Sequence, residues 1–137
     1  MKLIADNLRI TNPDIQQALQ DQNPEPVRHM ARACERAGAW AIDVNTGPLG
    51  RNPEEGMRFF IDAVESVTDL TLLIDTSNPK AMRTGLEQAK NKVIINGFSL
   101  EQKKMDKILP LAREFDTDIV GFLLDSNSQV PKNDEQR

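Results

Sequence analysis

The stretch LTLLIDTSNPKAMRTGLEQAKNKVIIN, residues 70–96, decides the fold class. It begins with an apolar run, 70–74, that lacks the alternation of a half-exposed strand, so it predicts a strand buried on both faces. Asn78 followed by Pro79 predicts a helix start, because Asn caps helices and Pro is favoured at their first position. A second apolar run follows at 92–95. A strand, a helix and a strand in this order predict parallel pairing with a right-handed crossover.

The same unit recurs along the whole chain. Three more apolar runs predict strands at 3–5, 39–44 and 118–124. Further helix starts are expected where Asn precedes Pro, and where Ser is followed by Gln three residues later, at 12–13, 23–24, 52–53 and 99–102. The predicted order is β(αα)βαβαβαβ. No linker or change in composition interrupts it, so we expect one α/β domain with a parallel sheet.

Composition excludes several classes of protein. The chain has 137 residues, 39% hydrophobic and 28% charged, which is ordinary for a globular domain. The net charge of −4, with Lys and Arg scattered, gives no basic face, so neither nucleic acid nor a membrane is an expected partner. The single cysteine, Cys34, cannot form an internal disulfide, and no leader or spanning run follows Met1. We expect a soluble protein in the cytoplasm.

Every apolar run ends in Asp or Asn. The residues concerned are Asp6, Asn7, Asp43, Asn45, Asp75, Asn96, Asp125 and Asn127. In a parallel sheet the carboxyl ends of the strands lie together, where α/β barrels and open α/β sheets place their sites. One such residue is explained by the preference of Asp and Asn for turns and caps. Five strand ends in succession favour a polar pocket instead.

The pocket is predicted to bind a neutral heterocycle. No phosphate loop or zinc ligand set is present, and we expect no metal site. His29, the only histidine, falls within a helix and is expected at the surface, whereas Cys34 and Trp40 are expected to pack. An ionised Asp accepts two hydrogen bonds from adjacent N–H groups of an amino-pyrimidinone edge, and Asn offers one donor and one acceptor.

The loop after the second predicted strand is a further candidate. Gly47 and Gly50 permit the positive-φ turns of a loop that folds over a ligand, and Arg51 could meet an anionic tail. The alternative is a solvated connection with an ordinary surface arginine.

The same segments resemble the methyltetrahydrofolate:corrinoid/iron–sulfur protein methyltransferases. Residues 41–48 resemble the LDLNVGP motif of that family, residues 72–78 resemble LCLDSTN, and residues 93–96 resemble MIN. Dihydropteroate synthases and the folate domain of methionine synthase share the barrel and similar signatures, and are the main alternatives. The N-terminal segment differs from the family pattern, because residues 5–8 occupy the position where many members have the sequence GERIN. No role is therefore carried over to Asp6 or Asn7, and a divergent branch is indicated.

The resemblance implies a pterin-binding (β/α)8 TIM barrel. Residues 1–137 would be its N-terminal part, the first five βα units, truncated at the start of the fifth crossover helix. Such a barrel has eight strands and about 250 residues, so the first and fifth strands would be unpaired edges. We expect a fragment of a longer gene product; the alternatives are pairing with a second copy or with the missing half of the barrel.

The resemblance also implies the function and the site residues. Asp75 and Asn96 would hydrogen-bond the pterin ring of methyltetrahydrofolate, with Asp43 and Asn45 as supporting residues. The reaction would move the N5-methyl group between methyltetrahydrofolate and the cobalt of a corrinoid protein, a partner that carries cobalamin. No catalytic residue is expected in this portion, because the Asn nearest N5 would lie beyond Arg137. The isolated chain would then be inactive. Family members tend to be homodimers.

The sequence leaves one structural alternative and two functional alternatives to this interpretation. A complete flavodoxin-like domain has this length and five βα units. It would need a phosphate loop where residues 10–13 stand, or, as a receiver domain, a Lys where the fifth strand ends in Asp125. The functional rivals are a dihydropteroate synthase-like enzyme and a pterin-binding protein without catalysis.

Overall fold

A computed structural model describes residues 1–47, 52–124 and 129–133. Its five strands form one sheet in which neighbouring strands are parallel. The strands are β1 (Ile4–Arg9), β2 (Ala41–Asn45), β3 (Thr71–Asp75), β4 (Val93–Phe98) and β5 (Asp118–Gly121). The helices are α1 (Pro13–Gln20), α2 (Glu25–Arg36), α3 (Pro53–Glu65), α4 (Pro79–Gln88), α5 (Gln102–Lys107) and α6 (Leu109–Glu114).

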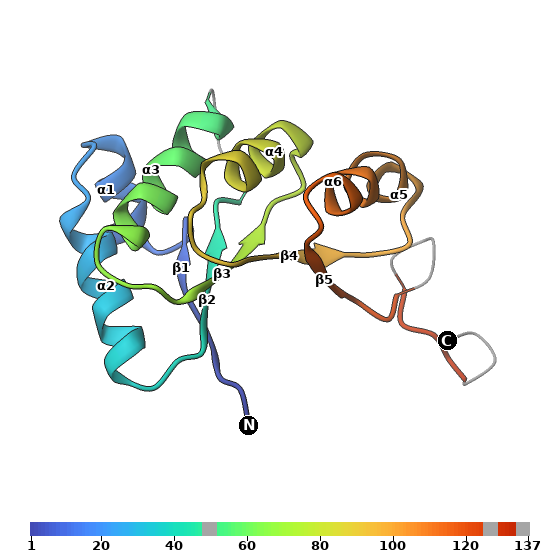
Figure 1. The fold of residues 1–137 in the computed structure, drawn as a ribbon, viewed down its shortest axis with the longest axis horizontal. Coiled ribbons are helices and arrows are strands. Elements are labelled where there is room, and N and C mark those ends of the chain that lie inside the picture. Colours follow the sequence, from blue (N-terminus) through green and yellow to red (C-terminus); the bar gives the residue numbers. More distant parts are fainter. Residues whose placement is uncertain (48–51, 125–128, 134–137) are drawn as a thin grey trace.

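The strands are ordered β1-β2-β3-β4-β5, so each pairs with the next one along the chain. Figure 1 shows the helices gathered over one face of the sheet, with the other face open. A flavodoxin-like domain has the order 2-1-3-4-5 with helices on both faces, so that alternative is wrong. Sequential parallel strands covered on one face are the arrangement of a βα barrel. The fold is therefore part of such a barrel, as predicted.

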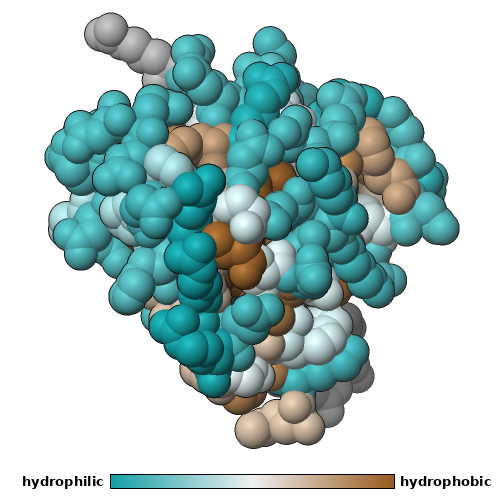
Figure 2. Space-filling model, turned by 60° about the vertical axis from the view of Figure 1, so that its left-hand side comes forward, coloured by the Kyte–Doolittle hydropathy of each residue, from teal (hydrophilic) through white to brown (hydrophobic). Residues whose placement is uncertain are grey.

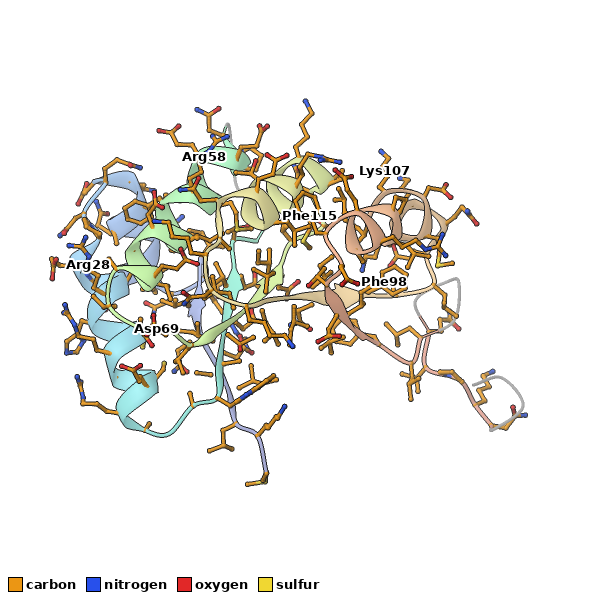
Figure 3. All side chains as sticks on the ribbon, in the orientation of Figure 1. Arg28, Arg58, Asp69, Phe98, Lys107 and Phe115 are labelled. Carbon is orange, nitrogen blue, oxygen red and sulfur yellow. The ribbon has the colours of Figure 1, made fainter. Side chains whose placement is uncertain are left out.

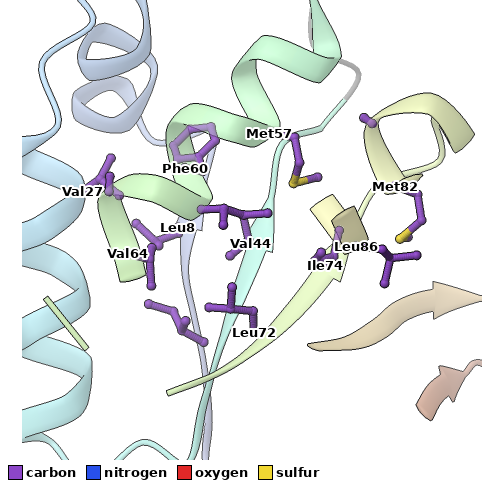
Figure 4. Packing of buried hydrophobic residues seen from close by; sticks show 14 of the residues in the cluster. Leu8, Val27, Val44, Met57, Phe60, Val64, Leu72, Ile74, Met82 and Leu86 are labelled. Atoms are coloured by element: carbon purple, nitrogen blue, oxygen red, sulfur yellow. The ribbon is translucent and has the colours of Figure 1, made fainter. Parts of the chain in front are cut away.

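The main core lies between the sheet and the helices (Figure 4). Leu8, Val44, Leu72 and Ile74 point from the strands toward the buried faces of α2, α3 and α4. The helices contribute side chains that are buried at helical spacing: Val27, Met57, Phe60, Val64, Met82 and Leu86. Burying one large apolar side chain contributes roughly 1.5–3 kcal/mol, so this layer supplies most of the stabilisation of the sheet.

A smaller apolar layer lies on the open face. Ala41, Leu73 and Ile94 are buried there, and Trp40 packs against them. The Lys2 ammonium sits 3.9 Å from the centroid of the Trp40 ring. Trp40 is therefore a packing residue, as predicted. Cys34 is buried among core residues and His29 is exposed at the surface, which also agrees with the predictions.

Several element boundaries differ from the predicted ones. β1 continues through Asp6 and Asn7 to Arg9, with an irregularity in its pairing between Ala5 and Leu8, so those two polar residues do not end the strand. β5 ends at Gly121 instead of residue 124. Asn12 and Asn78 cap α1 and α4 as predicted, whereas Asn52 makes no capping bond at α3.

The predicted capping box at residues 99–102 is wrong. The Ser99 hydroxyl donates to the Glu101 carboxylate, and Glu101 itself is the residue before α5. The expected single helix is also divided into α5 and α6 near Ile108. Pro110 explains this break, because it has no N–H to donate to the carbonyl four residues earlier.

Both edges of the sheet carry apolar surface. β1 and β5 each pair on one side only within residues 1–47, 52–124 and 129–133. A groove of about 370 Å³ beside β1 is lined by Leu3, Ile4, Met30 and Cys34 among others, and a second of about 260 Å³ at β5 includes Phe122 and Leu123. Figure 2 turns the side with α1 and α2 forward and shows apolar side chains among hydrophilic ones. Unpaired apolar edges were expected of a partial barrel.

Candidate functional site

One row of polar side chains crosses four neighbouring strands. Arg9 of β1 pairs in register with Asn45 of β2, Asn45 with Asp75 of β3, and Asp75 with Asn96 of β4. Their chain neighbours Leu8, Val44, Ile74 and Ile95 belong to the core under the helices. Because side chains alternate across a strand, the polar row lies on the open face. It stands at or near the carboxyl ends of the strands, where sequence predicted a crevice.

Asn45 and Asp75 form the first hydrogen-bonded pair in this row. Asn45 Nδ2 donates to Asp75 Oδ2 at 2.9 Å, and Asn45 Oδ1 accepts from the backbone N–H of Gly47 at 2.9 Å. Gly47 has φ +56°, and a Cβ there would lie 2.6 Å from Cγ2 of Ile10. The glycine is therefore required for the turn that holds the Asn45 amide, as its predicted positive φ suggested. Gly50 and Arg51 lie outside the described residues.

Asn96 and Asp43 form the second pair. Asn96 Nδ2 donates to Asp43 Oδ2 at 2.6 Å. Asp43 lies one row deeper on the open face, in register with Leu73, and only 3% of it is exposed. The structure therefore brings together all four residues that sequence selected as ligand-binding or supporting: Asp43, Asn45, Asp75 and Asn96.

The two carboxylates are perturbed in the same direction. Burial raises the pKa of Asp43 to about 6; the bond from Asn96 opposes the rise, the charge of Asp75 adds to it, and Arg9 opposes it. Burial also raises the pKa of Asp75, against the positive charges of Lys104 and Arg9. Two carboxylates that share a partly buried site are costly to ionise together. Such perturbation is characteristic of functional sites.

Sequence reasoning missed three residues of the site: Arg9, Gly97 and Lys104. Arg9 Nε donates to Asp6 Oδ1 at 2.6 Å, and the two side chains form an ion pair. Arg9 could have been found only by extending the first strand through Asp6 and Asn7, where polar residues in place of apolar ones concealed it.

Gly97 and Lys104 support Asp75 from β4 and α5. Gly97 has φ +76°, and a Cβ there would lie 2.7 Å from Asp75 Oδ1. Lys104 Nζ donates to the carbonyl of Gly97 at 2.8 Å. A glycine directly after a strand-end Asn was the available signal for Gly97; nothing in the sequence pointed to Lys104.

Other predicted strand-end residues do not join the row. Asp6 lies within β1 and binds Arg9, and Asn7 is exposed. Asp125 and Asn127 lie outside the described residues. In the part of the chain that the structure describes, no three His, Cys, Asp or Glu residues are grouped so as to hold a metal ion. No helix there is long and apolar enough to cross a membrane.

The comparison with known proteins decides the family. The profile of the family described as pterin binding enzymes matches residues 8–137. The chain belongs to this family. The pterin-binding enzyme family therefore accounts for the fold of sequential βα units and confirms the resemblance found in the sequence motifs.

Two relatives of this member of the pterin-binding enzyme family are informative. A methylcorrinoid:tetrahydrofolate methyltransferase of Eubacterium limosum is 27% identical over 139 residues, which cover 100% of this chain and 51% of the relative. A methionine synthase of Mycobacterium leprae (strain TN) is 23% identical over 106 residues, 74% of this chain and 9% of the relative. The chain thus spans about half the length of the first relative and a small part of the second.

Proposed function

We propose that this chain supplies one wall of the pterin pocket of a methyltransferase that moves a methyl group between methyltetrahydrofolate and a corrinoid protein. In this proposal Asp75 and Asn96 bind the pterin ring, and Asp43 and Asn45 support them. The observation that carries the proposal is the row of Asn45, Asp75 and Asn96 on the open face of a member of the pterin-binding family. In this row Asn45 donates to Asp75, and Asn96 donates to the deeper Asp43.

The donors and acceptors of this wall suit a pterin. The pyrimidinone ring of a pterin carries an amino group next to a ring N–H, and an ionised carboxylate such as Asp75 can accept from both. Burial of the site strengthens these bonds, since few water molecules compete with the ligand. The name of the Eubacterium limosum relative favours a methyltransferase over the dihydropteroate synthase alternative.

The chemistry proposed is the transfer of a methyl group from the N5 nitrogen to cobalt. The electron pair of Co(I) forms the new carbon–cobalt bond, while the N5–carbon bond breaks and its electron pair stays on nitrogen, which takes up a proton. Transfer in the opposite direction reverses each step. The residues of this chain contribute binding and orientation, because holding the ring in line with the acceptor lowers the barrier to displacement.

The group that protonates N5 is expected beyond Arg137, on the strength of the family resemblance. The same resemblance supports residues 1–137 as the N-terminal part of the barrel domain. It also supports a partner that carries cobalamin and a homodimer. The cytoplasmic setting is proposed from the single cysteine of the chain.

A calorimetric titration tests the binding role. Methyltetrahydrofolate is titrated into the complete gene product, into its Asp75→Ala variant and into Asp69→Ala as a matched control. Asp69 is an exposed Asp just before the start of β3, at the end away from the site (Figure 3). We expect Asp75→Ala to abolish measurable binding and Asp69→Ala to bind like the wild type. Unchanged affinity in Asp75→Ala would refute the proposal.

A further inference from the structure

The bond between Asn96 and Asp43 spans two strand positions. Asp43 belongs to β2 and Asn96 to β4, and β3 lies between them in the sheet. Asn96 sits in the same row as Asp75, whereas Asp43 sits in the row of Leu73 and Ile94, one step deeper. The Asn96 side chain therefore reaches back from the row of Asp75 to the deeper row, where its amide meets the Asp43 carboxylate.

Asp43 is in no position to meet a ligand directly. It is 97% buried, and its Oδ1 is enclosed without a hydrogen-bond partner among the described residues. A buried carboxyl oxygen without a partner is costly, and such groups in native proteins call for an explanation. Among the residues that the structure describes, the Asp43 carboxylate accepts a side-chain hydrogen bond from Asn96 alone, at 2.6 Å. Asn96 is therefore the hydrogen-bonded link from Asp43 to the row of the site, beside the effect of the Asp43 charge on Asp75.

An ionised carboxylate can only accept hydrogen bonds, so it decides which end of an amide faces it. With Asp43 ionised, the NH2 group of Asn96 must point inward, and the carbonyl oxygen of Asn96 must point toward the open face. A protonated Asp43 can donate instead, which permits the reversed amide. The orientation of the Asn96 amide thus depends on the protonation of Asp43, a residue that does not contact the ligand.

We propose that Asp43 is a positioning residue that fixes the Asn96 amide with its carbonyl oxygen toward the pterin, so that the ligand must offer an N–H group at that point. The inference rests on the proposed function for the identity of the ligand. The hydrogen bond from Asn96 to Asp43 does not depend on that function. Asn96 is then an acceptor like Asp75, and the wall selects a ring edge rich in N–H donors.

The charged groups around Asp43 shape its titration. Asp75 faces it from β3 and disfavours its ionisation, while Arg9 from β1 and the amide of Asn96 from β4 favour ionisation. Arg9 is itself paired with Asp6, and Lys104 of α5 acts on Asp75. Burial is the largest influence, and together with these charges it raises the pKa of Asp43 to about 6, close enough to neutrality for the amide to be observed in both states.

The test follows the side-chain amide resonances of asparagine by NMR in the ligand-free protein between pH 4 and 8. We expect the Asn96 amide to titrate with a midpoint near 6, and this titration to disappear in Asp43→Asn. The Asn45 amide, which is bonded to Asp75, should still titrate in that variant. Asn91 is the internal control, because its amide donates to the backbone carbonyls of Thr68 and Leu70, both at 3.0 Å, and should not titrate.

A binding measurement completes the test. We expect Asp43→Asn to raise the Kd for methyltetrahydrofolate by at least about fivefold, the scale of one weakened hydrogen bond. An Asn96 amide that does not titrate in the wild type, or that titrates unchanged in Asp43→Asn, would overturn the inference. So would unchanged affinity in Asp43→Asn where Asp75→Ala abolishes binding. Titration of Asn96 in a protein that binds no folate would keep the positioning role and refute the proposed function instead.

Discussion

Asn96 on β4 reaches across β3 to donate a 2.6 Å hydrogen bond to Asp43 on β2. Together with the bond from Asn45 to Asp75, it ties three parallel strands by their side chains on the open face of the sheet. The wall is thus held in shape by the protein before any ligand arrives, which lowers the cost of ordering it on binding.

Removing the Asn96 side chain should weaken folate binding without abolishing it. In Asn96→Ala one acceptor for the ligand is lost and Asp43 loses its donor, so we expect affinity for methyltetrahydrofolate to fall by roughly 1–3 kcal/mol. Calorimetric titration at pH 7 measures the change. Binding equal to that of the wild type would show that Asn96 does not contact the ligand.

Adding one methyl group at Gly97 should disturb Asp75. A Cβ at this residue would lie 2.7 Å from Asp75 Oδ1, and φ is +76°. We expect Gly97→Ala to lower the unfolding free energy by roughly 1–3 kcal/mol and to weaken folate binding. Gly38→Ala is the matched control: its φ is +83°, but a Cβ there meets nothing within 4 Å. Gly38→Ala should have the same backbone strain and leave folate binding unchanged. An equal loss of binding in the two variants would show that the contact with Asp75 is not the cause.

Stability should depend on the protonation of Asp43 in a direction opposite to that of most Asp residues. Its pKa is about 6 in the folded protein and about 3.9 in an unfolded chain. Between pH 4 and 6 the folded state therefore binds more protons, so the unfolding free energy falls as pH rises through this window and levels off above it. The raised pKa of Asp75 acts in the same direction.

Urea denaturation of the wild type and Asp43→Asn at pH 4 and 7 isolates this effect. The comparison is needed because Glu114, whose pKa is lowered by its bond with Arg83, contributes stability in the opposite direction. On going from pH 4 to 7, we expect the unfolding free energy of the variant to rise by roughly 1–3 kcal/mol relative to that of the wild type. If the unfolding free energies of the variant and the wild type differ by the same amount at both pH values, ionisation of a buried Asp43 does not destabilise the folded protein, and the prediction fails.

A polypeptide of residues 1–137 alone should show no methyl transfer. It holds the proposed binding wall, but the group expected to protonate N5 lies beyond Arg137, and an amine leaves poorly without a proton. The assay follows the absorbance of Co(I) in a corrinoid protein mixed with methyltetrahydrofolate. Turnover by this polypeptide would show that the chemistry needs no residue outside it.

The parts of the fold that sequence predicted are those set by local patterns. Apolar runs separated by Asn-Pro helix starts were enough for five parallel strands, and their Asp and Asn ends located Asp43, Asn45, Asp75 and Asn96. The pairing of those four could not be foreseen, because the bond between Asn96 and Asp43 depends on the register of three strands.

The errors have local causes too. Polar Asp6 and Asn7 concealed the second half of β1, and with it Arg9. Pro110 divided a helix whose apolar spacing looked continuous. Lys104 contributes through its position on α5, above Gly97, which only the packing of that helix against β4 reveals.

A crystal structure of the complete gene product with bound tetrahydrofolate tests the central claim most directly. The account predicts the pterin ring on the open face of the sheet, with its N–H groups within hydrogen-bonding distance of Asp75 and the carbonyl oxygen of Asn96, and with Asp43 beneath Asn96 and out of reach of the ligand. A pterin bound elsewhere, or one that leaves Asp75 and Asn96 without contact, would contradict it.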